Sequence, residues 1–296
     1  MSIGNRTQVE TASSRGPTLV DAHDPDNLAI AWNRVKANRG AAGNVGLELE
    51  DFPAFIRQHW ERLRGKLEGG SYRPAPVRRV DIPKDGGGTR PLGIPTVLDR
   101  LIQQAIAQVL TPVYDPDFSE HSHGFRPMRS AHGAIREMAE SGKQIGRRCH
   151  VVDCDLKAFF DTVDHQKLMA RLRDRVSDPS LLALILRYLK AGAILPDGQY
   201  EERLGGVPQG GPLSPLMANI LLDELDVELE ERGHKFVRYA DDFVILCRSL
   251  RAGQRILRSV RRFLADKLKL IVNEAKSRVV KLAEASFLGF QIVRRK

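Results

Sequence analysis

The sequence predicts an α+β fold, with helices packed on a mixed sheet. Apolar residues recur at helical spacing between Leu98 and Val109. Val80 and Ile82 alternate with charged residues before the turn at 85–88, which is typical of a hairpin. The apolar runs 236–239 and 243–246 flank a short turn and indicate a second hairpin. Strands interleaved with helices, with hairpins among them, favour a mixed sheet over a doubly wound one.

The remaining elements follow from the same patterns. Residues 1–26 are polar and are expected to form a disordered leader. Apolar spacing predicts helices at 28–38, 52–67, 98–109, 181–189, 215–231 and 251–268. Alternation and short apolar runs predict hairpins at 77–94 and 236–246 and strands at 151–156 and 287–293.

Composition narrows the class of protein. Hydrophobic residues make up 42% of the chain, enough for a packed core, and the formal net charge of +9 predicts attraction to polyanions. Cys149, Cys154 and Cys247 form no CxxC pair, which argues against a zinc site or a disulfide framework. The first twenty residues hold no apolar run, and no stretch is apolar enough to span a bilayer. We expect a cytoplasmic protein that does not enter a membrane.

Acidic residues at two places point to chemistry. Asp241 and Asp242 occupy the turn of the second hairpin, where a solvated turn is one interpretation, since Asp favours turns. The apolar flanking strands instead place the turn at the edge of a core, where unpaired carboxylates are costly. Asp153 and Asp155 share one face of a strand, and Asp155 lies at its carboxyl end.

Asp155 and the Asp241 turn would together form a cluster of like charges. Such a cluster is stable only if the acids take up protons or bind divalent cations. Magnesium prefers carboxylate oxygens together with substrate phosphates, which is the arrangement that nucleotidyl transfer requires. The sequence therefore predicts a magnesium site for nucleotidyl transfer if the fold brings these acids together.

The chain resembles the reverse transcriptases encoded by group II introns over about residues 28–293. Eight motifs stand in the family's order, at Ala31–Gly40, Ile82–Pro95, His123–His132, Asp155–His165, Gly206–Pro215, Tyr239–Asp242, Asn273–Lys276 and Phe287–Phe290. Val45 departs from the family, which usually has an Asp there, and His121-Ser122-His123 is slightly unusual. Neither departure touches an expected metal ligand.

The resemblance implies a right-hand polymerase fold, with helical fingers that carry a β-hairpin and a palm with an antiparallel sheet packed on helices. The fingers are expected at 27–150 and 166–204, and the palm at 151–165 and 205–296. The thumb or maturase domain and the endonuclease that many relatives carry are expected to be absent. The implied activity is RNA-directed DNA polymerisation by two magnesium ions, for which Mn²⁺ could substitute.

The resemblance also assigns roles to single residues. Asp155 and Asp241 would bind both metal ions, with Asp242 as the third acid and the Leu156 carbonyl as a further ligand. The residues implied for binding the deoxynucleotide are Lys84, Arg90, Phe160, Gln209 and Lys276. The primer grip would be Phe287, Leu288, Gly289 and Phe290, and Arg126 and Arg129 would contact template RNA. The implied partners are an RNA template, a DNA or RNA primer, dNTPs and group II intron RNA.

Several alternatives stay open. The chain could be an RNA-binding splicing cofactor or a remnant with little polymerase activity, although the intact acids favour catalysis. Phe160, a bulky residue at the sugar position, argues against an RNA-templated RNA polymerase. Arg251, Arg255, Arg258 and Arg262 form a helical stripe that either is a solvated face or binds RNA, and the solvated face is the commoner case. His165 is expected to be structural. Oligomeric state and biological role stay open.

Overall fold

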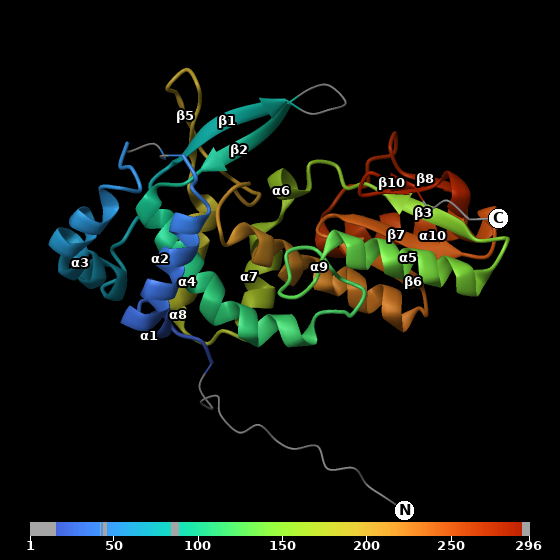
Figure 1. Ribbon diagram of the computed structural model, residues 1–296, viewed down its shortest axis with the longest axis horizontal. Coiled ribbons are helices and arrows are strands. Elements are labelled where there is room, and N and C mark those ends of the chain that lie inside the picture. The colour runs from blue at the N-terminus through green and yellow to red at the C-terminus, as the bar shows by residue number, and fades with distance from the viewer. Residues whose placement is uncertain (1–15, 42, 44–45, 84–88, 292–296) are drawn as a thin grey trace, which may run out of the picture.

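The computed structural model describes residues 16–41, 43, 46–83 and 89–291. Figure 1 shows a helical lobe, coloured from blue to yellow, beside a sheet lobe, coloured mainly green and orange to red. The expected residues Val45 and Lys84 lie outside the described part, as does most of the expected leader. Among the described residues, no helix is long and apolar enough to cross a membrane.

The helical lobe is built around one central helix. Its helices are α1 (Leu19–Ala22), α2 (Pro25–Ala37), α3 (Phe52–Glu68), α4 (Val97–Tyr114), α7 (His165–Arg173) and α8 (Pro179–Lys190). Helix α4 buries eleven residues, because its apolar positions extend around most of its circumference. Helix α2 packs along it, and Trp32 of α2 stacks on Phe52 of α3 with ring centroids 4.8 Å apart.

The end of the expected disordered leader is folded, so that prediction is wrong for residues 18–26. Thr18 and Asp21 form a capping box that starts α1, and Leu19 and Ala22 are buried. Asp24 caps α2, whose first residue is Pro25. These polar residues are helix caps, which a search for apolar spacing does not detect.

The first predicted hairpin is present and belongs to a larger sheet. Strand β1 (Val77–Pro83) pairs antiparallel with β2 (Thr89–Ile94), with Val80 opposite Leu92. Two short strands, β4 (Ala193–Ile194) and β5 (Tyr200–Glu201), extend the sheet in the order β2-β1-β4-β5. The segment 166–204 therefore joins the hairpin through β4.

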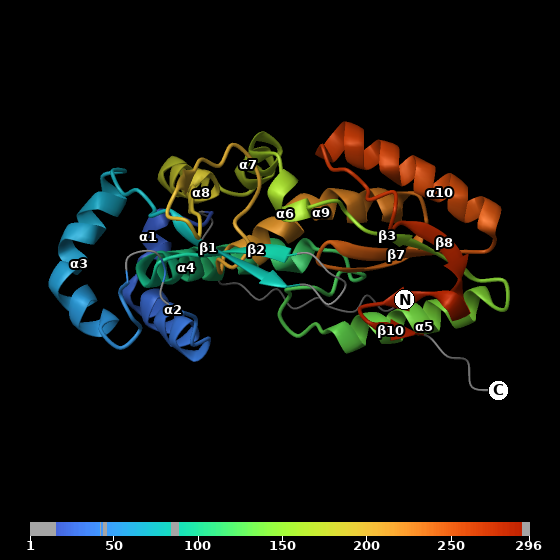
Figure 2. The same cartoon turned by 90° about the horizontal axis from the view of Figure 1, so that it is seen from above.

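The sheet lobe holds the main sheet, in the order β6-β7-β3-β8, with every neighbouring pair antiparallel. Its strands are β3 (His150–Cys154), β6 (Lys235–Tyr239), β7 (Asp242–Cys247) and β8 (Arg278–Lys281). Helix α5 (Ala131–Ile145) covers one face, and α10 (Leu250–Phe263) covers the other (Figure 2). Helix α9 (Ser214–Glu231) contacts both β6 and α4, and so joins the two lobes. Short helical turns complete the chain at α6 (Phe159–Thr162), η1 (Asp115–Asp117), η2 (Leu264–Leu268) and η3 (Leu282–Glu284).

The predicted last strand is instead a small hairpin. Strands β9 (Ser286–Phe287) and β10 (Phe290–Gln291) pair antiparallel around Leu288 and Gly289. These two residues have φ values of 52° and 80°, a left-handed pair that reverses the chain in a tight hairpin turn. Residues 292 and 293 of the predicted strand lie outside the described part.

Candidate active site

The predicted acids meet at one end of the main sheet. Asp155 directly follows β3, and Asp241 and Asp242 form the turn and first residue of β7. Because β3 and β7 are antiparallel neighbours with Cys154 opposite Phe243, Asp155 leaves the sheet beside Asp242. Ala240 adopts a left-handed φ of 58°, which makes the tight turn between β6 and β7.

The carboxylates of Asp155, Asp241 and Asp242 interact electrostatically. Loss of hydration in the crowded turn raises the pKa of Asp242 to about 6, and the charges of Asp241, Asp155 and Asp153 add to the shift. Burial likewise raises the pKa of Asp241, with Asp155 adding to the rise and Arg90 opposing it. The site is therefore a cluster of like charges at which a positive charge is strongly favoured.

The Asp155 carboxylate is oriented by the segment after α10. Asn273 Nδ2 donates to Asp155 Oδ2 at 2.9 Å, and the Asp155 backbone N–H donates to Ser277 Oγ at 3.1 Å. Lys276 Nζ lies 4.0 Å from the same carboxylate oxygen, and its side chain is 67% exposed. An exposed cation at the edge of the acid cluster is suited to meet an incoming phosphate.

The residues fit a divalent cation that completes its shell with substrate. Among the described residues, no group of three or more His, Cys, Asp or Glu is placed so that it could hold a metal ion. Magnesium is commonly bound by one or two carboxylates plus water and substrate phosphates, so an open acid cluster suits it. Leu156 adjoins Asp155 and forms a β-bridge with Val272. That its carbonyl binds an ion stays a prediction.

A buried network, missed in the sequence, supports the acidic turn. Arg238 and Asp226 are both fully buried and ion-paired at 2.5 Å. The Arg238 guanidinium also donates to the Ala240 carbonyl and to Asn219 Oδ1, both at 2.9 Å. The signal in the sequence is weak: Arg238 stands between apolar residues of β6, but Asp226 is one of several acids on α9, so nothing marks it as the partner that a buried charge requires.

Gly124 allows a second segment to reach the same turn. A Cβ at this position would overlap the backbone nitrogen of Ala240, so only glycine permits the approach. Asn219 Nδ2 donates to the Gly124 carbonyl at 2.9 Å, which links this contact to the buried network. The segment His121–His123 also forms two backbone hydrogen bonds with Arg238: the His123 N–H donates to the Arg238 carbonyl, and the Arg238 N–H donates to the His121 carbonyl. The turn is therefore held by β6, α9 and the 121–124 segment together.

A cavity of about 500 Å³ brings together three of the five predicted nucleotide-binding residues, and Lys276 does not line it. Its lining includes Arg90, Phe160 and Gln209, together with Arg100 and Phe125, and contains no acidic residue. Arg90 Nε donates to Gln209 Oε1 at 2.6 Å, so the hairpin and the 206–215 loop meet at this point. Arg90 is also close enough to Asp241 to affect its pKa. The cavity therefore has the positive lining that a triphosphate needs, beside the acids.

The loop 206–215 is fixed beneath Phe160. Val207 N–H donates to the Phe160 carbonyl at 2.6 Å, and Gly206 N–H donates to the Val163 carbonyl at 2.8 Å. His165 Nε2 lies 2.7 Å from the Gly206 carbonyl, consistent with its expected structural role. The ring of Phe160 packs edge-on against that of Phe159, with centroids 5.1 Å apart. Phe160 is thus held rigidly where it lines the cavity.

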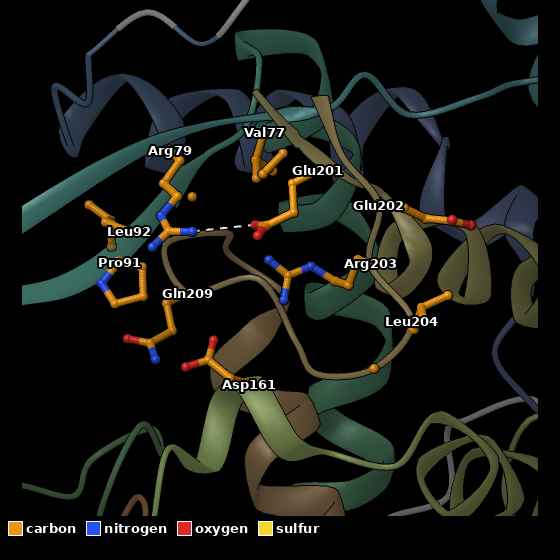
Figure 3. Close-up of a pocket in the computed structure, with 13 residues that line it drawn as sticks. Val77, Arg79, Pro91, Leu92, Asp161, Glu201, Glu202, Arg203, Leu204 and Gln209 are labelled. Atoms are coloured by element: carbon orange, nitrogen blue, oxygen red, sulfur yellow. Dashed lines mark hydrogen bonds and ion pairs between the residues drawn. The ribbon is translucent and has the colours of Figure 1, made fainter. Parts of the chain in front are cut away.

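A second cavity, of about 420 Å³, shares Leu92 and Gln209 with the first one (Figure 3). Arg79 and Arg203 line it with three acids, Asp161, Glu201 and Glu202. Arg79 is ion-paired with Glu201 at 3.4 Å. Because its acids outnumber its arginines, this cavity suits a triphosphate less well than the first one does.

The structure contradicts the prediction that Arg126 contacts template RNA. Its side chain is only 5% exposed and pairs with Asp115 at 2.8 Å. It also donates to the carbonyls of Asp115, Ser119 and Ser122, and stacks over Phe118. This guanidinium holds the loop after α4 together. Arg129, paired with Glu120, is partly exposed, so its RNA contact stays a prediction.

The predicted primer grip forms the β9–β10 hairpin beside α5. Phe287 is buried in a cluster with Met138 of α5, and Phe290 is 45% exposed. The Phe290 ring meets His132 of α5 edge-on, with centroids 5.7 Å apart. An exposed aromatic at a hairpin end is available for a ligand, and its role in gripping a primer stays a prediction.

An antiparallel sheet with acids at one end, facing an arginine-lined cavity under a hairpin, defines a template-copying polymerase of the right-hand class. The chain belongs to the reverse transcriptase family: residues 82–292 match the family described as reverse transcriptase (RNA-dependent DNA polymerase). This confirms the resemblance seen in the motifs.

Relatives and solved structures agree. Protein YkfC of Escherichia coli K12 is 34% identical, over 92% of this chain and 81% of that protein. The group II intron-encoded protein LtrA of Lactococcus lactis is 32% identical, over 90% of this chain. The chain spans 55% of LtrA's length. A telomerase from Candida tropicalis, solved with a fragment of telomeric RNA, superimposes with a TM-score of 0.57 at 15% identity, over 79% of this chain and 47% of that one. The right-hand polymerase fold is thereby confirmed.

Proposed function

We propose that this chain extends a primer 3′-hydroxyl with deoxynucleotides on an RNA template, using two magnesium ions. The observation that carries the proposal is the position of Asp155, Asp241 and Asp242 together at one end of the main sheet, beside a cavity lined by Arg90 and Gln209. Bound divalent ions would activate the primer hydroxyl and stabilise the leaving pyrophosphate. The helical lobe would act as fingers and the sheet lobe as palm.

Different side chains of the protein would perform different parts of the proposed reaction. Arg90 and Lys276 approach the acids from opposite lobes and would neutralise the charge on the triphosphate oxygens. Asn273 keeps the Asp155 carboxylate in one orientation, which matters because misplaced ligands lose much of the rate. Phe160 would close the cavity against a 2′-hydroxyl on the incoming sugar.

Asp241→Asn should abolish nucleotide addition, because it removes a metal-binding charge and keeps the side chain's shape. We expect primer extension on an RNA template to fall roughly a thousandfold or more, while RNA binding and thermal stability persist. Asp197→Asn, in an exposed turn, is the matched control and should retain full activity. Near wild-type extension by Asp241→Asn would contradict the proposal.

The metal can be tested separately. Removing divalent ions with a chelator should stop extension without releasing RNA, and Mg²⁺ or Mn²⁺ should restore it. Restoration by Ca²⁺ alone, or extension that persists in chelator, would contradict the two-magnesium mechanism.

The similarity to LtrA supports group II intron RNA as a further partner. A splicing assay with the Asp241→Asn variant separates the two functions. Splicing that survives while extension is lost would mean that the chain also acts as a splicing cofactor, independently of its acids.

A further inference from the structure

The positive charge of the chain is concentrated in one segment. Residues 248–269 contain eight Lys and Arg and one Asp, and so account for seven of the nine net positive charges. The remaining 274 residues carry 38 Lys and Arg against 36 Asp and Glu. Any general attraction to polyanions therefore originates mainly in this segment, most of which is α10.

Four of these cations form a narrow stripe on α10. Arg251, Arg255, Arg258 and Arg262 follow one another at three or four residues, and all four are exposed. The opposite side of the helix is buried on the main sheet through Gly253 and Val260. At about 1.5 Å per residue, the stripe extends about 16 Å along the helix.

Acids elsewhere do not neutralise the stripe. Among the described residues, the ion pairs at this helix and at α9 join Arg261 to Glu274, Arg232 to Glu228, Arg171 to Glu224 and Arg238 to Asp226. None involves the four stripe arginines. Four unpaired guanidinium groups on one face of a helix repel one another, which slightly destabilises the helix. A face that only contacted water would gain nothing from this arrangement.

The stripe is also separate from the proposed catalytic site. None of its arginines lines either cavity beside the 206–215 loop. Helix α10 lies on the side of the main sheet opposite α5, as Figure 2 shows. A ligand of the stripe would therefore be additional to a nucleotide in the cavity.

We propose that the α10 stripe binds the phosphate backbone of a nucleic-acid duplex, independently of the polymerase chemistry proposed above. Guanidinium groups are matched to phosphate oxygens, and regular spacing on a straight helix suits a regular array of phosphates. Single strands are usually bound with aromatic stacking platforms, and the only aromatic residue of α10 is the half-buried Phe263. Binding would be independent of base sequence.

The test measures how binding depends on salt. The variant R251Q/R255Q/R258Q/R262Q and the unaltered chain are titrated with a duplex RNA and a duplex DNA of equal length. Loss of four phosphate contacts should lower the slope of log affinity against log salt by about 3 to 4. For each duplex, the ratio of the affinity of the unaltered chain to that of the variant should then shrink about 60- to 250-fold between 50 and 200 mM salt. The two duplexes show whether the stripe prefers RNA.

Two controls make the result specific. R57Q/R62Q on α3 removes two exposed arginines elsewhere and should change the slope much less than R255Q/R258Q does. The fourfold Arg→Lys variant keeps the charges and should keep most of the salt dependence. Extension of a short primer–template at saturation should be unchanged in all stripe variants.

Equal slopes for the unaltered chain and the fourfold Gln variant would overturn the proposal, provided that circular dichroism shows the variant folded. If the fourfold variant does not fold, the double variant R255Q/R258Q is measured instead, and a slope equal to that of the unaltered chain would overturn the proposal. Stripe-dependent binding to anionic lipid vesicles, with none to either duplex, would also overturn it.

Discussion

At the residue scale, the site depends on a few side chains whose surroundings leave them little freedom. Asp155 is held by Asn273, and the Asp241 turn by the buried pair of Arg238 and Asp226. Resemblance to a family could place Asp155 and Asp241 in advance, because motifs identify residues. It misassigned Arg126, because whether an arginine faces solvent or folds inward depends on how the surrounding loop is folded, here on contacts with Asp115 and Ser119.

Replacing Phe160 should relax sugar selection. The ring lines the cavity beside Arg90 and Gln209, so a smaller side chain opens space for a 2′-hydroxyl. We expect Phe160→Val and Phe160→Ala to reduce the preference for deoxynucleotides, measured as a ratio of kcat/KM values, by roughly tenfold or more. Phe159→Val is the control, because Phe159 belongs to the same core but does not line the cavity. An unchanged ratio would mean that Phe160 serves only the core.

A methyl group at Gly124 should displace the acidic turn. Because the new Cβ would overlap the Ala240 backbone, Gly124→Ala must shift the turn or the 121–124 segment. A shift on the order of 1 Å can reduce the rate about a hundredfold, so kcat should fall to that extent. Gly65→Ala, within α3 and free of neighbours, should be fully active and up to about 1 kcal/mol more stable. Full activity of Gly124→Ala would show that the turn tolerates movement.

At the element scale, strands and helices with strong apolar patterns were predictable, and elements defined by contacts were not. Helix α5 escaped prediction because its buried face consists of Ala134, Met138 and Gly142, of which only Met138 is a large apolar residue. Strand β8 is a four-residue edge strand that exists because β3 offers it a partner. The 121–123 segment has no strand pattern at all and is held by β6 and by α5.

The attachment of this segment to α5 should depend on pH. His121 and His123 both contact Glu137, and these hydrogen bonds outweigh burial and lower the pKa of Glu137 to about 2. The hydrogen bond to Glu137 raises the pKa of His121. The His121 contribution is complete below about pH 6.5 and is lost as pH rises through its folded pKa. The Glu137 contribution is complete above about pH 4.5 and is lost as pH falls toward 2.

Glu137→Gln should therefore destabilise the protein most between about pH 4.5 and 6.5. We expect the free energy of unfolding to fall by about 1 kcal/mol at pH 5.5 and by clearly less at pH 9. The loss is modest because the side chain of His121 is 42% exposed, so that solvent partly screens its charge. Thermal melts at the two values measure it. Glu140→Gln, exposed on the same helix, should show no such difference between them. Equal losses for Glu137→Gln at both values would contradict an ionic contribution.

At the scale of the whole molecule, the largest hydrophobic core spans both lobes, and two smaller clusters lie under α5 and between α2, α3 and α4. A single cluster of buried residues includes Ile106 of α4, Leu184 of α8, Leu222 of α9 and Ile245 of β7. The sequence predicted the helices and strands that supply these residues, but not that they pack into one core. Which helix faces which strand depends on the packing of all the elements together. The acids and the cavity lined by Arg90, Phe160 and Gln209 lie where the two lobes meet, so the proposed catalysis would require the lobes to stay together.

A continuous core predicts that both lobes unfold in one transition. The only two tryptophans, Trp32 and Trp60, lie on α2 and α3, so their fluorescence reports on the helical lobe alone. Ile245→Val, in the sheet lobe, should cost about 0.5–1.5 kcal/mol, and Asp226→Asn, which leaves Arg238 buried without its partner, about 3–5 kcal/mol. If the core is cooperative, each variant shifts the fluorescence melt and the circular dichroism melt by the same amount. Ile256→Val, half-buried on α10 against the same core, should give a smaller shift with the same coincidence. A fluorescence midpoint that stays fixed while the dichroism midpoint falls would show that the lobes fold separately, and that their alignment at the acids depends on substrate rather than on the core.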